Sequence, residues 1–315
     1  MKVLVTAIGS MSAECVIESL RHFGAAVVGT DIYPREYHPI SNMCHSFHQV
    51  PRAIPDADHY CRTLKKIAEN EGCVAIIPLT DPEVDAVSEN RSVFERAGVK
   101  VWLSDDKVIK TVRNKGLWSQ MLAESKNFKT IPSYTAYSDL QKNHKGDFVA
   151  KKVDGRSSEG ILFSNTNLFR ENDASYVDYI FQPKIEGDVL TVDFAIHPIS
   201  RQLVCVPRIE LMRTKNGAGT VVKIVDLGIC EHAVREIADR LGLTGVMNCE
   251  FICGKDGIYL MDINPRFSAG VSFSKMAGYD FVEANVRCYC AQNLRPWGNL
   301  DVGSILVKRF LDFRV

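Results

Sequence analysis

The order of β-rich and helical segments changes near residue 105, and this change limits the possible folds more than any other feature. Before it, helix-like stretches separate apolar runs at Val3–Ile8, Ala26–Thr30, Val74–Leu79 and Val99–Leu103. Strands that alternate with helices predict a parallel sheet with right-handed crossovers. We therefore expect an α/β, Rossmann-like domain over residues 1–105, which binds ligands beyond the carboxyl ends of its strands.

After residue 105 the strand candidates come in adjacent pairs joined by turns, which is typical of antiparallel sheets. A helix is predicted over residues 234–241, where apolar residues recur at helical spacing before Gly242. This part, residues 106–315, should therefore be an α+β domain. The paired strands are Phe148–Val153 with Ile161–Phe163, Leu190–His197 with Leu203–Ile209, and Met247–Ile252 with Gly257–Ile263.

Composition excludes several classes of protein. Lys plus Arg and Asp plus Glu both number 38 among 315 residues, so no net field attracts nucleic acid or an anionic membrane. No apolar run reaches the roughly 18 residues of a membrane helix, and the chain enters a strand directly, without a signal-like segment. The ten cysteines show no C-x-x-C spacing. We expect a soluble, intracellular, cytoplasmic protein without a disulfide framework.

The segment NCEFICGKDGIYLMDINPRFSAG, residues 248–270, holds the clearest candidate for a metal site. Lys255-Asp256-Gly257 indicates a turn, and a hairpin centred near Asp256 places Glu250 opposite Asp262. Alternation along the second strand puts Asp262 and Asn264 on one face. Such oxygens suit Mg²⁺, and Arg266 follows directly. The alternative is that they are solvated polar positions on the outer face of a hairpin.

Two further segments have the composition of nucleotide-binding elements, although each alone is a weak signal. In DFVAKKVDGRSSEGI, a strand carries Lys151 and Lys152, and a loop rich in glycine and serine follows. Such a loop can bind phosphate through backbone N–H groups, or it can be an ordinary polar hairpin loop. The segment DYIFQPKIEGDVLTVDF, residues 178–194, is a short strand, a polar crossing and a second strand.

Taken in order, Lys115, Lys151 with its loop, FQPKIEGDVLTVDF, Glu250 and DINPR resemble the ATP-grasp superfamily. The likeness spans about residues 105–290, and it is greatest to the carbamoyl-phosphate synthase large-chain-like and carboxylate–amine ligase branch. The first 105 residues resemble the smaller Rossmann-like domain that precedes the grasp domain in such enzymes. The resemblance implies two subdomains, about 115–185 for ATP and 186–315 for catalysis and metal binding.

The resemblance also implies a role for each motif, with ATP lying between the two subdomains. Arg266 and Lys151 would act in catalysis, with Arg266 facing the transferring phosphoryl group or the substrate carboxylate. One or two Mg²⁺ ions would bind to Glu250, Asp262 and Asn264. The nucleotide would contact Lys115, Lys151, Gly155, Ser157, Ser158, Gly160, Gln182, Pro183, Lys184, Ile185 and Asp188.

Some positions depart from the family pattern. Lys152 stands where proline is usual, and Asp262 is one methylene shorter than the usual glutamate. Val189 stands where a glutamate commonly binds ribose, so either Asp188 substitutes for it or that contact is missing. Pro183 replaces a residue that is often acidic. These departures concern the nucleotide more than the metal.

The implied function is an ATP- and Mg²⁺-dependent ligase that phosphorylates a small carboxylate to an acyl phosphate and couples it to an amine or similar nucleophile. The substrate walls would come from Thr80–Glu83 and from the loop-like region Arg208–Gly219, with Arg208 or Arg213 as a carboxylate clamp. Partners would be small molecules, with a homodimer possible by analogy.

Three alternatives stay open. A nucleotide-binding regulatory or assembly protein without turnover would explain Val189 and Pro183. A grasp enzyme that stops at the phosphorylated product belongs to the same class. An NAD(P)-dependent oxidoreductase would use Asp31 at a strand end, although residues 7–14 lack G-x-G-x-x-G.

Overall fold

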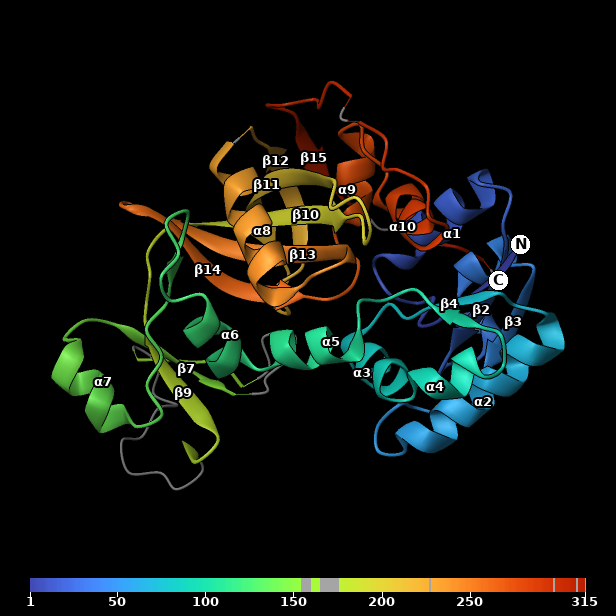
Figure 1. Cartoon of the computed structure of the whole chain (residues 1–315), viewed down its shortest axis with the longest axis horizontal. Coiled ribbons are helices and arrows are strands. Elements are labelled where there is room, and N and C mark those ends of the chain that lie inside the picture. Colours follow the sequence, from blue (N-terminus) through green and yellow to red (C-terminus); the bar gives the residue numbers. More distant parts are fainter. Residues whose placement is uncertain (154–159, 165–175, 227, 297, 310, 315) are drawn as a thin grey trace.

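Figure 1 shows the computed structural model of the chain, which describes residues 1–153, 160–164, 176–226, 228–296, 298–309 and 311–314. The first sheet has the order β3-β2-β1-β4-β5, and all its pairs are parallel. The predicted α/β class is confirmed, and β3 is a strand that the sequence reading missed. The strands are β1 (Lys2–Val5), β2 (Ala26–Asp31), β3 (Ser46–Gln49), β4 (Ala75–Ile77) and β5 (Lys100–Val101).

Helices cover both faces of this sheet. Val3 and Val5 pack into one core with α1, whereas Leu4 packs into another with α2 and α4. Burial on both faces explains why the strands are continuous apolar runs. The helices are α1 (Ala13–His22), α2 (Ala57–Glu71), α3 (Asp81–Glu89) and α4 (Arg91–Glu95), with 3₁₀ turns η1 (Arg35–Tyr37) and η2 (Pro39–Met43).

Two helices lead from this domain to a small sheet, at the lower left of Figure 1. They are α5 (Asp106–Arg113) and α6 (Lys115–Met121), and α7 (Tyr137–Asn143) follows. The small sheet is antiparallel, with the order β8-β7-β9. Its strands are β7 (Phe148–Lys152), β8 (Leu162–Phe163) and β9 (Tyr179–Pro183).

A seven-stranded sheet forms the rest of the chain, with the order β15-β12-β11-β10-β13-β14-β6. All its pairs are antiparallel except β14 with β6. The predicted α+β class is thus confirmed as well. The strands are β6 (Lys129–Thr130), β10 (Asp188–Ile196), β11 (Leu203–Arg213), β12 (Gly219–Ile224), β13 (Gly245–Gly254), β14 (Gly257–Asn264) and β15 (Ile305–Val307).

The two faces of the large sheet differ. Helix α8 (Gly228–Leu241) packs on one face, against residues such as Val192 and Cys249. On the other face, α9 (Val271–Met276) and α10 (Phe281–Tyr289) join a core that also contains α1 of the first domain. Beyond that core the second face turns polar, and the candidate site lies there. None of the helices in the described part of the chain combines the length and apolar character that a membrane span requires.

Candidate active site

A bulge in the β13–β14 hairpin brings two acids opposite each other. Near the turn Phe251 pairs with Leu260, but beyond it the register shifts, and Glu250 pairs with Asp262. Without the extra residue, Glu250 would face Met261. The predicted pairing of Glu250 with Asp262 is therefore correct, and a β-bulge produces it.

The acids lie on the polar face of the hairpin, since their strand neighbours Cys249 and Ile263 point into the core under α8. Glu250, Asp262 and Asn264 all line one pocket, which we call the acidic pocket. Its other walls come from β10, β11, the β11–β12 turn and the segment after β14. The hairpin thus brings the three predicted metal ligands together.

Each acid is paired with a cation. Lys115 Nζ lies 2.7 Å from Asp262 Oδ1, and Arg213 Nη2 lies 2.8 Å from Glu250 Oε2. Burial raises the pKa of Glu250; Arg213 opposes this effect, and the neighbouring charge of Asp262 adds to it. Positive charge is therefore what this pair of carboxylates requires.

The same residues fit a magnesium ion. Two carboxylates that repel each other and one amide oxygen are hard ligands, and the ion would offset the repulsion that raises the pKa of Glu250. Within the described part of the chain, no cluster of three or more His, Cys, Asp or Glu side chains offers a competing metal site.

Lys151 lies on β7 of the small sheet and is half-buried. Burial lowers the pKa of Lys151 to about 8; the charge of Lys115 adds to this effect, and the charges of Asp262 and Glu250 oppose it. Lys151 is therefore within electrostatic range of the two acids, and it is not one of the residues that line the acidic pocket. Its neighbour Lys152 is exposed.

Asn248 is a site residue that the sequence reading missed. Its Oδ1 accepts a hydrogen bond from Asn264 Nδ2 at 3.2 Å, and its Nδ2 donates to the carbonyl of Arg266 at 2.9 Å. Asn248 thus orients Asn264 and fixes the chain that follows. The available signal was its position, two residues before Glu250 on the same face of β13.

Arg266 binds an acid of the first domain. Its Nε and Nη2 donate to the two carboxylate oxygens of Asp81 at 2.7 and 3.0 Å. Asp81 also accepts from Arg113 Nη2 at 2.8 Å, and Arg113 Nε donates to Asp85 at 2.8 Å. Burial alone would raise the pKa of Asp81, but Arg266 and Arg113 outweigh it and hold that pKa well below its ordinary range.

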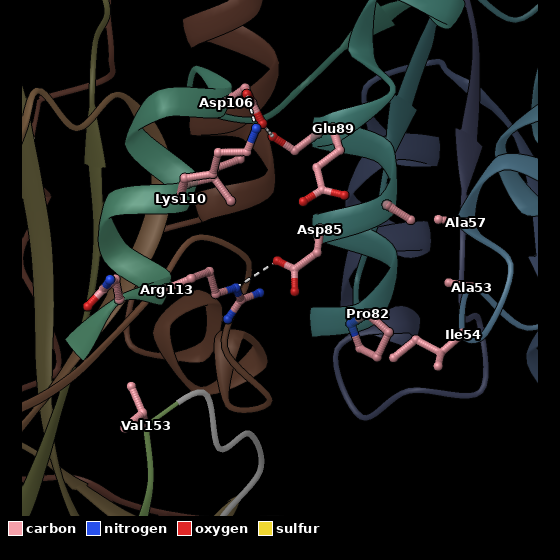
Figure 2. A pocket seen from close by; sticks show the side chains of 14 residues that line it. Ala53, Ile54, Ala57, Pro82, Asp85, Glu89, Asp106, Lys110, Arg113 and Val153 are labelled. Carbon is pink, nitrogen blue, oxygen red and sulfur yellow. Dashed lines mark hydrogen bonds and ion pairs between the residues drawn. The ribbon is translucent and has the colours of Figure 1, made fainter. Parts of the chain in front are cut away.

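Figure 2 shows the pocket of about 400 Å³ beside this network, with α5 on one side and α3 on the other. Arg113 points across it to Asp85, and Val153 lies at its far end. The predicted loop Thr80–Glu83 is in fact the start of α3, because Thr80 and Glu83 form a capping box. That geometry aims Asp81 at Arg266.

The region Arg208–Gly219 also departs from its predicted loop form, since β11 runs to Arg213 and β12 begins at Gly219. Arg208 is buried, with Nη1 2.6 Å from Asp193 Oδ2 and Nε 3.3 Å from Glu210 Oε1. With two acids already beside it, Arg208 forms a wall of the acidic pocket rather than a free carboxylate clamp. Arg213 is likewise paired with an acid of the protein, Glu250, and is not a free carboxylate clamp.

The segment 182–185, for which the family resemblance implies contact with the nucleotide, joins the small sheet to the large one. Gln182 is buried and donates to Ser133 Oγ at 2.7 Å, while Lys184 pairs with Glu186 at 2.6 Å. Pro183 ends β9 and Asp188 begins β10, with Ile185 between them. Gly155, Ser157 and Ser158 lie outside the described residues, and Gly160 has a φ of 70°. Their nucleotide contacts stay predictions.

Asp31, on which the oxidoreductase alternative depended, is already engaged. Its Oδ2 accepts from the Gly9 N–H at 2.9 Å, and its Oδ1 accepts from the Tyr33 N–H at 3.1 Å. His38 Nε2 lies 3.2 Å from the same Oδ1. A carboxylate held in this way is poorly placed to bind the hydroxyls of a ribose.

Two models of known protein families match this chain. The model of the ATP-grasp domain matches residues 112–270, and that of the PylC-like N-terminal domain matches residues 3–102. A tyramine–L-glutamate ligase of Methanocaldococcus jannaschii is 24% identical over 216 residues, which are 66% of this chain. The match spans 60% of the length of that curated relative.

Solved structures share the fold. The biotin carboxylase domain of Hydrogenobacter thermophilus 2-oxoglutarate carboxylase, solved as a dimer with MgADP, ADP and bicarbonate, has a TM-score of 0.74 at 17% identity. That likeness covers 96% of this chain and 73% of the other. An L-amino acid ligase from Bacillus licheniformis has a TM-score of 0.68 at 14% identity, over 90% and 72% of the two chains.

These findings confirm the recognised superfamily and the order of its domains. The carbamoyl-phosphate synthase-like description fits only loosely, because the N-terminal match is to the PylC-like domain. ATP and Mg²⁺ are the cofactors of ATP-grasp enzymes, and the three ligands on the hairpin are suited to the metal. With about half of its length matched by the domain model, this chain belongs to the ATP-grasp family.

Proposed function

We propose that this chain is an ATP-dependent ligase that phosphorylates a small carboxylate and joins it to an amine. The observation that carries the proposal is the convergence of Glu250, Asp262 and Asn264 on one pocket that also includes Arg266. Two similar proteins are named as ligases, one for tyramine and L-glutamate and one for L-amino acids, which supports this class of reaction.

The reaction would have two steps. A carboxylate oxygen attacks the γ-phosphorus of ATP, the bond from that phosphorus to ADP breaks, and an acyl phosphate forms. The amine nitrogen then attacks the acyl carbon and loses its extra protons to solvent. Phosphate leaves and carries away one oxygen of the original carboxylate. No covalent protein nucleophile is needed.

The residues of the chain have distinct tasks in this scheme. Glu250, Asp262 and Asn264 would hold Mg²⁺, which would supply positive charge to offset that of the phosphate oxygens. Lys151 adds a cation from the small sheet. Arg266, held in place by Asp81, presents its remaining surface to the acidic pocket, where charge develops during the transfer.

For the nucleotide we keep the contacts that the family resemblance implies, with ATP between the small and large sheets. Lys115 and Lys151 would meet the phosphates, and residues 182–185 the adenine. We propose that the chain has two domains, residues 1–105 and 106–315. The second would have subdomains of about residues 115–185 and 186–315.

The test is a phosphate-release screen with Mg-ATP in which amino acids and other small carboxylates are paired with amines. For an active pair, a carboxylate labelled with ¹⁸O should transfer one labelled oxygen to phosphate. Release without label transfer would exclude the acyl phosphate. ATP binding without release across the whole panel would favour a regulatory protein instead.

We further propose a homodimer in the cytoplasm. The dimeric biotin carboxylase domain supports the first point, and light scattering after size-exclusion chromatography tests it. All ten cysteines are free thiols, which supports a reducing compartment. Fractionation of cells that produce the tagged protein tests the second point.

A further inference from the structure

A cavity of about 610 Å³ lies at the carboxyl edge of the parallel sheet, and we call it the aromatic pocket. Its walls come from the segments that follow β1, β2, β3 and β4. The chain reverses its direction of travel across the sheet between β1 and β4, and open α/β sheets bind ligands at such a switch point. Thr80 and Glu83, which were expected to form part of the substrate walls, line this cavity, but neither the family resemblance nor the proposed reaction specifies its occupant.

The aromatic pocket and the acidic pocket share wall residues with one smaller depression. A smaller depression between them shares Ser10, Thr80 and Pro82 with the aromatic pocket. The same depression shares Arg266 and Ala269 with the acidic pocket. The aromatic pocket and the acidic pocket therefore adjoin a common depression, whose walls include Thr80 and Arg266.

The aromatic pocket carries exposed apolar side chains. Tyr33, Tyr37 and Ile54 all line it and are 47%, 69% and 56% exposed. The ring centroids of Tyr33 and Tyr37 are 6.2 Å apart, and that of His38 lies 6.4 Å from Tyr33. Large apolar groups gathered around one cavity favour a ligand that covers them with a ring or a bulky apolar group.

The acids of the aromatic pocket are already satisfied, so they do not select a cation. Asp31 is engaged as described above. Glu83 accepts hydrogen bonds from the hydroxyls of Thr6, Tyr60 and Thr80 at 2.7 to 2.9 Å. Both carboxylates therefore stabilise the wall of the pocket through hydrogen bonds within the protein.

Arg52 is different. It lines the same pocket, and its side chain is exposed to solvent. In the part of the chain that the structure describes, no carboxylate lies within ion-pair distance of Arg52. A guanidinium on the wall of a largely apolar cavity favours an anionic group on the occupant.

We propose that the aromatic pocket is the acceptor subsite of the ligase, and that it selects an α-amino acid with an aromatic or bulky apolar side chain. The side chain lies on Tyr33, Tyr37 and Ile54, and the carboxylate faces Arg52. The amine is on the same carbon as that carboxylate, and it faces the depression that adjoins the acidic pocket. This inference rests on the proposed function, because it assigns the nucleophile of that reaction.

The kinetic test compares L-phenylalanine, phenethylamine and L-alanine as acceptors, with one saturating carboxylate donor from the screen. We expect kcat/KM for phenylalanine to exceed that for either competitor by about tenfold or more, which equals about 1.4 kcal/mol. Tyr37→Ala should remove the advantage over alanine. Arg52→Gln should remove the advantage over phenethylamine, and Arg52→Lys should restore part of it.

The control is Ile199→Ala, which removes a side chain that is 76% exposed at the β10–β11 turn and lines none of these three pockets. It should change none of the ratios. Equal use of phenylalanine and phenethylamine by the wild type would overturn the role of Arg52. A uniform loss for all three acceptors in Tyr37→Ala would overturn the role of the aromatic wall.

A binding test that needs no turnover separates this inference from the proposed function. Saturation-transfer NMR should detect L-phenylalanine on the wild type and a loss of signal in Arg52→Gln. If phenylalanine binding depends on Arg52 but the ¹⁸O experiment shows no acyl phosphate, the assignment of the pocket is supported and the ligase reaction is refuted. Turnover with no dependence on Arg52 or Tyr37 would refute the pocket and leave the ligase standing.

Discussion

The acidic pocket and the aromatic pocket treat charge in opposite ways. In the acidic pocket Glu250 and Asp262 each face a cationic side chain, and the repulsion between the acids remains. In the aromatic pocket the acids are saturated by backbone and hydroxyl groups, and Arg52 stands on a largely apolar wall. The difference teaches that charge is arranged for phosphoryl transfer in one place and for recognition of a substrate in the other.

The largest expected effect tests the acidic side of this comparison. Asp262→Ala should lower kcat by about a hundredfold or more, because the ligand acts mainly on developing charge. Asn264→Ala should act in the same direction. The measurement is phosphate release at saturating ATP, with circular dichroism to check the fold. Asp256→Ala, at the exposed turn of the same hairpin, is the control, and full turnover by Asp262→Ala would remove the metal assignment.

The next effect concerns the small sheet. Lys151→Ala should weaken ATP binding about ten- to a hundredfold, since a hydrogen bond to a charged group is worth about 1.5–3 kcal/mol. Isothermal titration calorimetry with Mg-ATP measures it. Lys152→Ala is the matched control, because the next residue along β7 is an exposed lysine. An unchanged Kd for Lys151→Ala would count against its phosphate role.

A smaller effect is expected at the link between the two domains. Asp81→Asn leaves Arg266 and Arg113 without their shared carboxylate, and the free energy of unfolding should fall by about 1–3 kcal/mol. Urea denaturation measures it. Asp239→Asn, which breaks an exposed pair with Arg201, should cost only about 0–1 kcal/mol. Equal losses in the two variants would show that the link is no stronger than a surface ion pair.

The smallest effect is the pH dependence of that link. The pKa of Asp81 is lower in the folded chain than in the unfolded chain, where it is about 3.9. Its stabilisation is therefore complete above about pH 5 and is lost as the pH falls toward the folded pKa. The stability difference between wild type and Asp81→Asn should be constant from pH 7 to 5 and smaller at pH 3. A difference that grows on acidification would reverse the sign.

Much of the fold could be predicted because its signals are local. The apolar runs of β1, β2 and β4 reflect burial on both faces, and paired runs joined by turns reflect antiparallel strands. The strand β3 was missed because its residues, SFHQ, include no continuous apolar run and are only partly buried. Its place in the sheet comes from pairing with β2, which no short window of sequence reveals.

In the candidate site, too, the features with local sequence signals were predicted and a feature of strand pairing was not. Turn chemistry at Lys255-Asp256-Gly257 and strand alternation were enough to bring Glu250, Asp262 and Asn264 to one face. The bulge that sets their register appears only in the pairing of β13 with β14, and it was not predicted.

The sequence by itself determined the parallel class of the first region, the antiparallel class of the second, and the identity of the hairpin acids. Only the tertiary structure decided that Arg266 binds Asp81, 185 residues away, and that Tyr37 and Arg52 face one cavity. The physical reason is range: periodicity and turn propensity act over a few residues. Ion pairs and cavities between remote segments exist only once the sheets have packed against their helices.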